Sequence, residues 1–174
     1  MANDKDFDWA LRFSLRWEGG DHHPTLADPN PTRKGITQRF YDAVAKKYGW
    51  RQSSVFDLTD PEIAACYRLI WEQSKAIRMP RLVACVHFDC SVNMSGSRAN
   101  RVLQRALGVT ADGVLGPRSF AAIDKAKPHE LAKRQLTWRG CEYFDLVEAN
   151  PRLKPNYQGW INRVNDLRRY VGVT

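Results

Sequence analysis

One carboxylate near the start of the chain stands where it could act as a proton donor. Glu18 ends a helical pattern and is followed by two glycines in the run W-E-G-G at 17–20. The unpaired carbonyl groups in the last turn of a helix create negative potential, which disfavours an ionised carboxylate and favours its protonated form. Gly19 and Gly20 would let a ligand approach the backbone closely. A carboxylic acid that keeps its proton near neutral pH can protonate a glycosidic oxygen.

Two further side chains could complete a site around Glu18. Asp28 lies in a Pro-rich polar loop and could face Glu18 as a second carboxylate, and Thr37 could place a hydroxyl at the mouth of the same cleft. Each feature also has a purely structural interpretation. The two glycines can end the helix, Asp28-Pro29 can form a turn, and Thr37 can cap the next helix.

The spacing of apolar residues predicts a mainly α fold, because they recur at three and four positions through most of the chain. Any hairpin is expected between residues 20 and 35. The first helix is expected to end at Gly19-Gly20, and the second to run from Ile36 to Tyr48 before Gly49. A third should start at the capping box of Thr59 and Glu62, and two more should cover Leu82–Val92 and Ala99–Leu107. Three further helices are expected to begin near Pro117, at Pro128 and before Trp160.

Composition and charge indicate what kind of partner the protein has and where it is made. The chain has 174 residues, a net charge of +8 and 43% hydrophobic residues, which indicates a globular protein with an anionic partner or surface. No apolar stretch of about 18 residues exists, and the acidic N-terminal residues differ from a signal peptide, so we expect cytoplasmic synthesis and no membrane insertion. The cysteines lack zinc-site spacing, and we expect buried, reduced thiols and no metal at Cys66, Cys85, Cys90 and Cys141.

Several motifs follow one another along the chain: E-G-G, D-P and K-G-I-T-Q near the start, L-T-D-P-E-I-A-A-C-Y-R-L-I-W, F-D-C-S-V-N, the run from R-V-L-Q-R-A-L-G to A-D-G-V-L-G-P-R-S-F, and G-W-I-N-R-V near the end. Their order and spacing resemble the glycoside hydrolase 108 family of phage and bacterial N-acetylmuramidases. The resemblance covers roughly residues 8–170. Two departures lie beside the site, since Asp21 stands where the family usually has an aromatic residue, and D-P-N-P replaces D-P-G-G.

The resemblance implies a lysozyme-like fold in one unit, 1–174, with a catalytic part at 8–94 and a C-terminal part at 95–172 that is similar to a peptidoglycan-binding region. It implies that Glu18 is the catalytic acid, and it aligns the family's loop Asp with Asp28 and its Thr with Thr37. Cleavage of the β-1,4 bond between N-acetylmuramic acid and N-acetylglucosamine is the implied reaction, with no cofactor.

Two more residues are candidates for substrate binding. Tyr41 lies one helical turn beyond Thr37 and could face the cleft, although its spacing suits the core equally well. Asn93, in S-V-N, could donate a hydrogen bond to a sugar N-acetyl group, or could simply cap its helix.

The expected function is that of a monomeric phage endolysin or bacterial lytic enzyme, held in the cytoplasm until release and acting on peptidoglycan glycan strands. A wall-binding module without activity is an alternative. A basic helical nucleic-acid binder is another, but no nucleic-acid-binding motif supports it.

Overall fold

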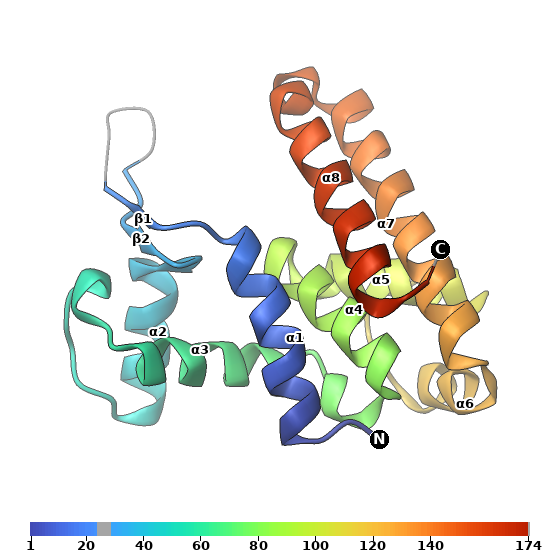
Figure 1. The fold of residues 1–174 in the computed structure, drawn as a ribbon, viewed down its shortest axis with the longest axis horizontal. Helices are drawn as coiled ribbons and strands as arrows, with labels where there is room; N and C mark the ends of the chain where they lie inside the picture. The colour runs from blue at the N-terminus through green and yellow to red at the C-terminus, as the bar shows by residue number, and fades with distance from the viewer. Residues whose placement is uncertain (24–28, 174) are drawn as a thin grey trace.

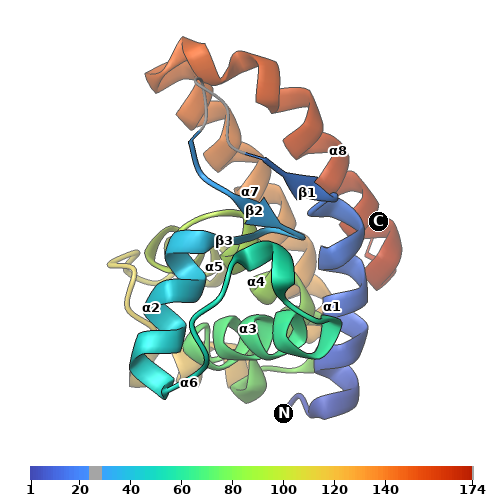
Figure 2. The ribbon, with the colours of Figure 1, turned by 90° about the vertical axis from the view of Figure 1, so that its left-hand side faces the viewer.

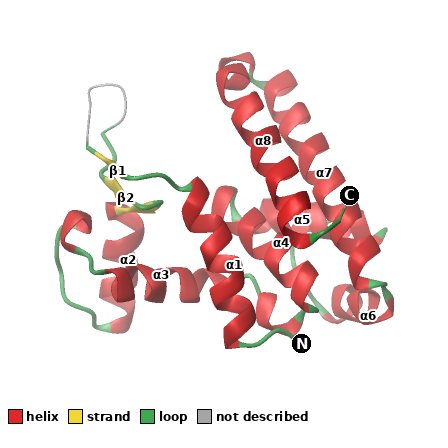
Figure 3. Cartoon of the chain, in the orientation of Figure 1, coloured by secondary structure: helices red, strands yellow, loops and turns green. Residues whose placement is uncertain are grey.

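The computed structural model describes residues 1–23 and 29–173 and is built mainly of helices (Figures 1 and 3). The expected mainly α fold is therefore confirmed. Its α-helices are α1 (Asp4–Trp17), α2 (Gln38–Tyr48), α3 (Asp60–Gln73), α4 (Arg81–Asn93), α5 (Gly96–Leu107), α6 (Pro117–Lys125), α7 (Pro128–Ala149) and α8 (Lys154–Val171). Short 3₁₀ turns at Val55–Asp57, Ala76–Arg78 and Pro151–Leu153 join some of them.

A small antiparallel sheet connects α1 to α2. It consists of β1 (Asp21–His22), β2 (Thr32–Arg33) and β3 (Ile36–Thr37) in the order β1-β2-β3. Figure 2 shows the sheet following directly from the upper end of α1 and leading into α2. The sheet extends beyond the expected hairpin, because Ile36 pairs with Arg33 instead of opening the next helix.

Local capping explains where the helices begin and end. The side chain of Thr37 accepts a hydrogen bond from the backbone N–H of Phe40, so α2 starts at Gln38, two residues later than the apolar spacing suggested. Thr59 and Glu62 form the expected capping box at the start of α3. Gly49 and Gly108 adopt left-handed conformations after α2 and α5, which confirms the predicted stops.

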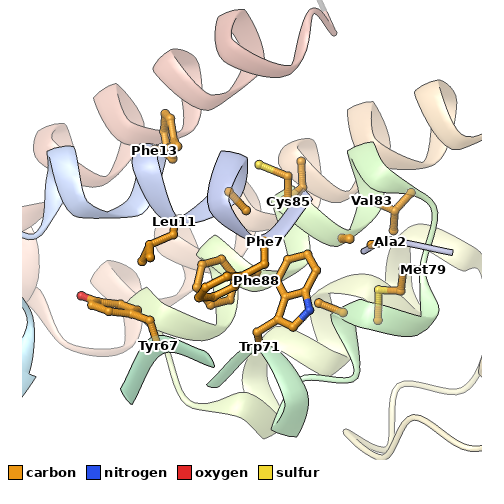
Figure 4. Close-up of a cluster of buried hydrophobic side chains, with 14 of the residues drawn as sticks. Ala2, Phe7, Leu11, Phe13, Tyr67, Trp71, Met79, Val83, Cys85 and Phe88 are labelled. Carbon is orange, nitrogen blue, oxygen red and sulfur yellow. The ribbon is translucent and has the colours of Figure 1, made fainter. Parts of the chain in front are cut away.

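One continuous hydrophobic cluster includes buried residues from both halves of the chain. At its centre, Phe7 of α1, Trp71 of α3 and Phe88 of α4 meet edge to face, with ring centroids 5.4–6.0 Å apart (Figure 4). The cluster continues through Leu136 of α7 and Leu167 of α8. The two halves therefore share one core in which α4 lies between α1 and α7.

The cysteines are free thiols, but they do not all lie in the core. Cys66, Cys85 and Cys90 are buried as expected, whereas Cys141 is exposed on α7. The expectation was wrong for Cys141, because this position lies on the side of α7 that borders an open groove beside α8. In the part of the chain that the structure describes, none of the helices combines the length and the apolar character needed to cross a membrane.

His87 generates a prediction about stability. It lies in the middle of α4 and is fully buried, and its Nδ1 contacts the side-chain amide of Gln135. Burial lowers the pKa of His87 from 6.5 to about 4. Between these two pH values the unfolded chain binds a proton that the folded protein does not bind, so the free energy of unfolding should fall by about 3 kcal/mol on acidification.

Urea unfolding at pH 7, 5.5 and 4.5 measures most of this loss, about 2 kcal/mol by pH 4.5. In His87→Gln the loss over this interval should be smaller by the same amount, because the substituted side chain does not titrate. An unchanged pH dependence in His87→Gln would show that the buried histidine is not its source.

Candidate active site

The end of α1 presents Glu18 at the surface of the core. Asn3 and Asp6 form a capping box that fixes the start of the helix, and α1 ends where Glu18 donates its backbone N–H to the carbonyl of Ser14. Gly19 then turns the chain with a φ of 68°, a left-handed conformation that favours glycine. The side chain of Glu18 is 17% exposed, so it reaches solvent while most of its surface is covered.

One oxygen of Glu18 is bound by an arginine from the other end of the chain. Nη1 of Arg163, on α8, donates a hydrogen bond of 2.7 Å to Oε1 of Glu18. Among the described residues, no hydrogen bond reaches the other oxygen, Oε2. Arg163 therefore anchors the carboxyl group through Oε1.

The loop between β2 and β3 closes against the other side of Glu18. Gly35 has a φ of +78°, and a methyl group at its Cα would lie 2.7 Å from Oε2 of Glu18 and 2.5 Å from the hydroxyl of Tyr67. That hydroxyl points away from the hydrophobic cluster (Figure 4) and donates to the carbonyl of Lys34. Burial raises the pKa of Tyr67, so its hydroxyl keeps its proton and holds the loop in place.

A pocket of about 390 Å³ opens beside Glu18. Its walls come from the ends of α1 and α4 and from the first half of α8. They include Trp17, Glu18, Asn93, Asn156, Trp160 and Arg163. Indole rings beside amide and carboxyl groups suit a sugar, which presents apolar ring faces and polar edges.

Asn93 shares this pocket with Glu18, as a substrate-binding residue would. It is the last residue of α4, and its Oδ1 accepts a hydrogen bond from the hydroxyl of Tyr143. The ring of Tyr143 in turn stacks on Trp160 with a centroid distance of 4.9 Å. Because the Oδ1 of Asn93 already accepts the bond from Tyr143, its NH₂ group is the part that could donate to a ligand.

The other sequence candidates are not assembled in the same way. Thr37 caps α2, the structural alternative considered above, and it lies two residues beyond Gly35. Tyr41 is only 1% exposed, donates its hydroxyl to the carbonyl of Arg51 and borders a different pocket, so the structure does not bring it to Glu18. Asp28 lies outside the described residues.

Sequence reasoning missed a buried ion cluster, which we define as Ser14, Asp89, Arg139 and Arg163. Asp89, on α4, is completely buried and accepts hydrogen bonds from Arg163 at 2.6 and 3.1 Å, from Arg139 at 2.7 Å and from Ser14 at 2.8 Å. Burial alone would raise the pKa of Asp89, but the two guanidinium charges lower it to about 2. An acidic residue inside the most apolar helix, V-A-C-V-H-F-D-C, was the available signal.

Within residues 1–23 and 29–173, no three His, Cys, Asp or Glu side chains gather as a metal ion would require.

Comparisons with known families divide the chain into two matches. Residues 11–95 match the family described as Glycosyl hydrolase 108. Residues 98–165 match the family described as Predicted Peptidoglycan domain. Glu18, Gly35 and Asp89 fall in the first match, whereas Arg139 and Arg163 fall in the second.

The fold is similar to that of a solved protein, SagA from Brucella abortus. The two structures superpose with a TM-score of 0.78 and are 24% identical in sequence, and the alignment covers 98% of this chain and 97% of that chain. This likeness confirms the expected lysozyme-like fold. A search of curated proteins found no match.

The closeness of Gly35 to Glu18 leads to a prediction. In Gly35→Ala the new methyl group must push Glu18 and Tyr67 aside, and a displacement of about 1 Å at a catalytic group can lower the rate by about 10²-fold. We therefore expect a loss of this order in the clearing of purified bacterial cell walls, followed as turbidity.

Gly49→Ala is the matched control. Gly49 has a similar φ of +69°, but a methyl group there meets nothing within 4 Å. Both variants carry the strain of a left-handed alanine, and only one crowds Glu18. Equal activities of the two variants, at equal folded fraction, would contradict the role given to the Gly35 contact.

Proposed function

As a member of the glycosyl hydrolase 108 family, the chain is a peptidoglycan hydrolase, and we propose that it cleaves the β-1,4 bond between N-acetylmuramic acid and N-acetylglucosamine with Glu18 as the general acid. One observation carries the proposal. Glu18 is a partly exposed carboxyl group beside an open pocket, with Oε1 anchored by Arg163 and Oε2 available.

The chemistry requires one proton transfer to the leaving group. Oε2 of Glu18 gives its proton to the glycosidic oxygen while the bond from that oxygen to C1 of N-acetylmuramic acid breaks. Water adds its oxygen to C1 and releases a proton, which restores the acid in the course of the turnover. The products are two shorter glycans, one of which has a new N-acetylmuramic acid reducing end.

Asn93 is the proposed recognition residue for an N-acetyl group. Asn93 lines the pocket that contains Glu18, and the hydrogen bond from Tyr143 to its Oδ1 leaves the NH₂ group as the donor. An amide donor meeting the carbonyl oxygen of an N-acetyl group is a direct polar complement. Trp17 and Trp160, which line the same pocket, would contact the sugar rings.

Asp28 and Thr37 are proposed to assist the water or to stabilise positive charge at C1, as the family resemblance implies. Thr37 lies two residues beyond Gly35, where an added methyl group would lie 2.7 Å from Glu18, and this supports a place for Thr37 near the site. We retain Tyr41 only as a residue that supports the fold of α2, because its hydroxyl is bound within the protein.

The cellular setting is proposed from the sequence and the substrate together. A basic protein of net charge +8 is attracted to the polyanionic wall, and synthesis in the cytoplasm would hold it away from that wall until release. A phage endolysin or a bacterial lytic enzyme has this requirement.

Glu18→Gln tests the assignment of the acid. The amide keeps the shape of the side chain and can still accept the Arg163 hydrogen bond, but it cannot donate the catalytic proton, so lysis of purified walls should fall by at least about 10²-fold. Glu148→Gln, at an exposed position of α7, is the control and should keep full activity. Full lysis by a folded Glu18→Gln protein would remove Glu18 from the mechanism, and a parent protein without lysis would be the wall-binding module considered above.

Mass spectrometry of borohydride-reduced digests tests the bond and the nucleophile in the same experiment. Reduced N-acetylmuramic acid ends are expected. Reduced N-acetylglucosamine ends would place cleavage at the other glycosidic bond. Anhydro ends would show that the sugar's own 6-hydroxyl replaces water. Either of these two results would overturn the proposed reaction.

A further inference from the structure

The end of α1 is tied to α8 by three successive residues. Arg16 and the indole N–H of Trp17 both donate to Asp166 of α8, at 2.9 and 2.8 Å. Glu18 then accepts from Arg163 at 2.7 Å. The carboxyl group assigned to catalysis is thus held by a helix of the region that matches the predicted peptidoglycan domain.

Arg163 uses its guanidinium group on two carboxylates at once. Nε and Nη2 donate to the two oxygens of Asp89, at 3.1 and 2.6 Å, and Nη1 donates to Glu18. Because a guanidinium is planar, pairing one edge with Asp89 fixes the plane and directs the third nitrogen. The direction of Nη1, and with it the position of Oε1 of Glu18, therefore follows from the placement of Asp89.

Asp89 is itself fixed from two other helices. Arg139 of α7 donates to Oδ2, and Ser14 of α1 donates to Oδ1. The side chains of Asp89 and Arg139 are fully buried, and that of Arg163 is 4% exposed. Such a group has little freedom to move, so the anchor for Glu18 is rigid before a substrate arrives.

The charge balance among four ionisable groups changes when the acid gives up its proton. These groups are Glu18, Asp89, Arg139 and Arg163. With Glu18 protonated, Arg139 and Arg163 face one carboxylate, Asp89. When Glu18 gives its proton to the glycosidic oxygen, it becomes a second carboxylate. The two arginines then face two negative charges. Arg163 thus stabilises the carboxylate that proton transfer leaves on Glu18.

We propose that Arg163 is a positioning residue for Glu18, that Asp89 orients Arg163 for this task, and that the C-terminal region accordingly completes the active centre instead of acting as a separate wall-binding module. The inference rests on the proposed role of Glu18 as the acid. It adds Asp89 and Arg163, which lie about 70 and 145 positions beyond Glu18 in the chain, to the residues that support the proposed acid.

The test compares Arg163→Lys with Arg139→Lys. Both substitutions replace a buried arginine that pairs with Asp89, but only Arg163 contacts Glu18. A lysine presents a single point charge and cannot hold two carboxylates in a fixed geometry. On a soluble tetrasaccharide of alternating N-acetylglucosamine and N-acetylmuramic acid, Arg163→Lys should lower kcat by about 10-fold or more and change KM by less than about threefold. Arg139→Lys leaves Arg163 and its pairings with Asp89 and Glu18 in place, so it should lower kcat by clearly less than Arg163→Lys does, at a similar loss of melting temperature.

Binding of the same tetrasaccharide separates positioning from substrate contact. Measured by calorimetry in the Glu18→Gln background, Kd should be unchanged by adding Arg163→Lys. A weaker Kd with normal kcat would make Arg163 a binding residue and overturn the proposal. Equal losses of kcat in Arg163→Lys and Arg139→Lys would reduce both residues to structural supports and would also overturn it.

If Arg163→Lys does not fold, Asp166→Ala keeps the proposal testable. Asp166 is partly exposed and holds Arg16 and Trp17, so its loss should loosen the end of α1 and lower kcat several-fold. Normal kcat in this variant would contradict positioning by α8. Loss of activity in Glu18→Gln alongside normal kcat in the α8 variants would reject this inference alone, whereas activity in Glu18→Gln would reject the proposed function first.

Discussion

A buried carboxylate between two arginines is the constraint on which the rest of this structure depends. Asp89 binds Arg139 of α7 and Arg163 of α8 inside a largely apolar core, and Ser14 of α1 donates to the same carboxylate. Removing one partner of a buried ion pair typically costs about 3–5 kcal/mol, because an uncompensated charge remains behind. The four helices are therefore committed to one arrangement.

That arrangement fixes a surface group as well as the core. Glu18 lies at the edge of the cluster, and it receives Arg163 on one oxygen while Gly35 approaches the other. The small sheet would be a weak element alone, since each strand has two residues. The hydroxyl of Tyr67 holds the loop after β2 in place by donating a hydrogen bond to the carbonyl of Lys34. The end of α1 that carries Glu18 is thus confined by the core, by α8 and by the sheet.

Much of the fold could be predicted from the sequence, because its helices are set by local signals. Capping at Thr59, the glycine at 49 and the apolar spacing all act over a few residues, and their outcomes matched expectation. Ile36 was placed in a helix by its spacing, but strand pairing and the Thr37 cap decided otherwise. Glu18 was proposed as the acid from its place before two glycines at a helix end and from the family resemblance, and its role stays a prediction.

The support for Glu18 could not be predicted, since it depends on contacts between residues far apart in the chain. Arg163 lies in the motif G-W-I-N-R-V, where nothing local distinguishes it from the other basic residues of the C-terminal helices. Asp89 carried a signal in its apolar surroundings, but its two partners could only be found in three dimensions. Tyr41 shows the converse, because its apolar spacing suited both a cleft and a core, and packing decided for the core.

The most direct test of this account is a crystal structure of the Glu18→Gln variant bound to a tetrasaccharide of alternating N-acetylglucosamine and N-acetylmuramic acid. The account predicts that the amide at position 18 lies about 3 Å from a glycosidic oxygen, with Arg163 still bonded to it and an N-acetyl group at Asn93. A saccharide bound elsewhere, for example in the groove between α7 and α8, with no contact to position 18, would contradict it.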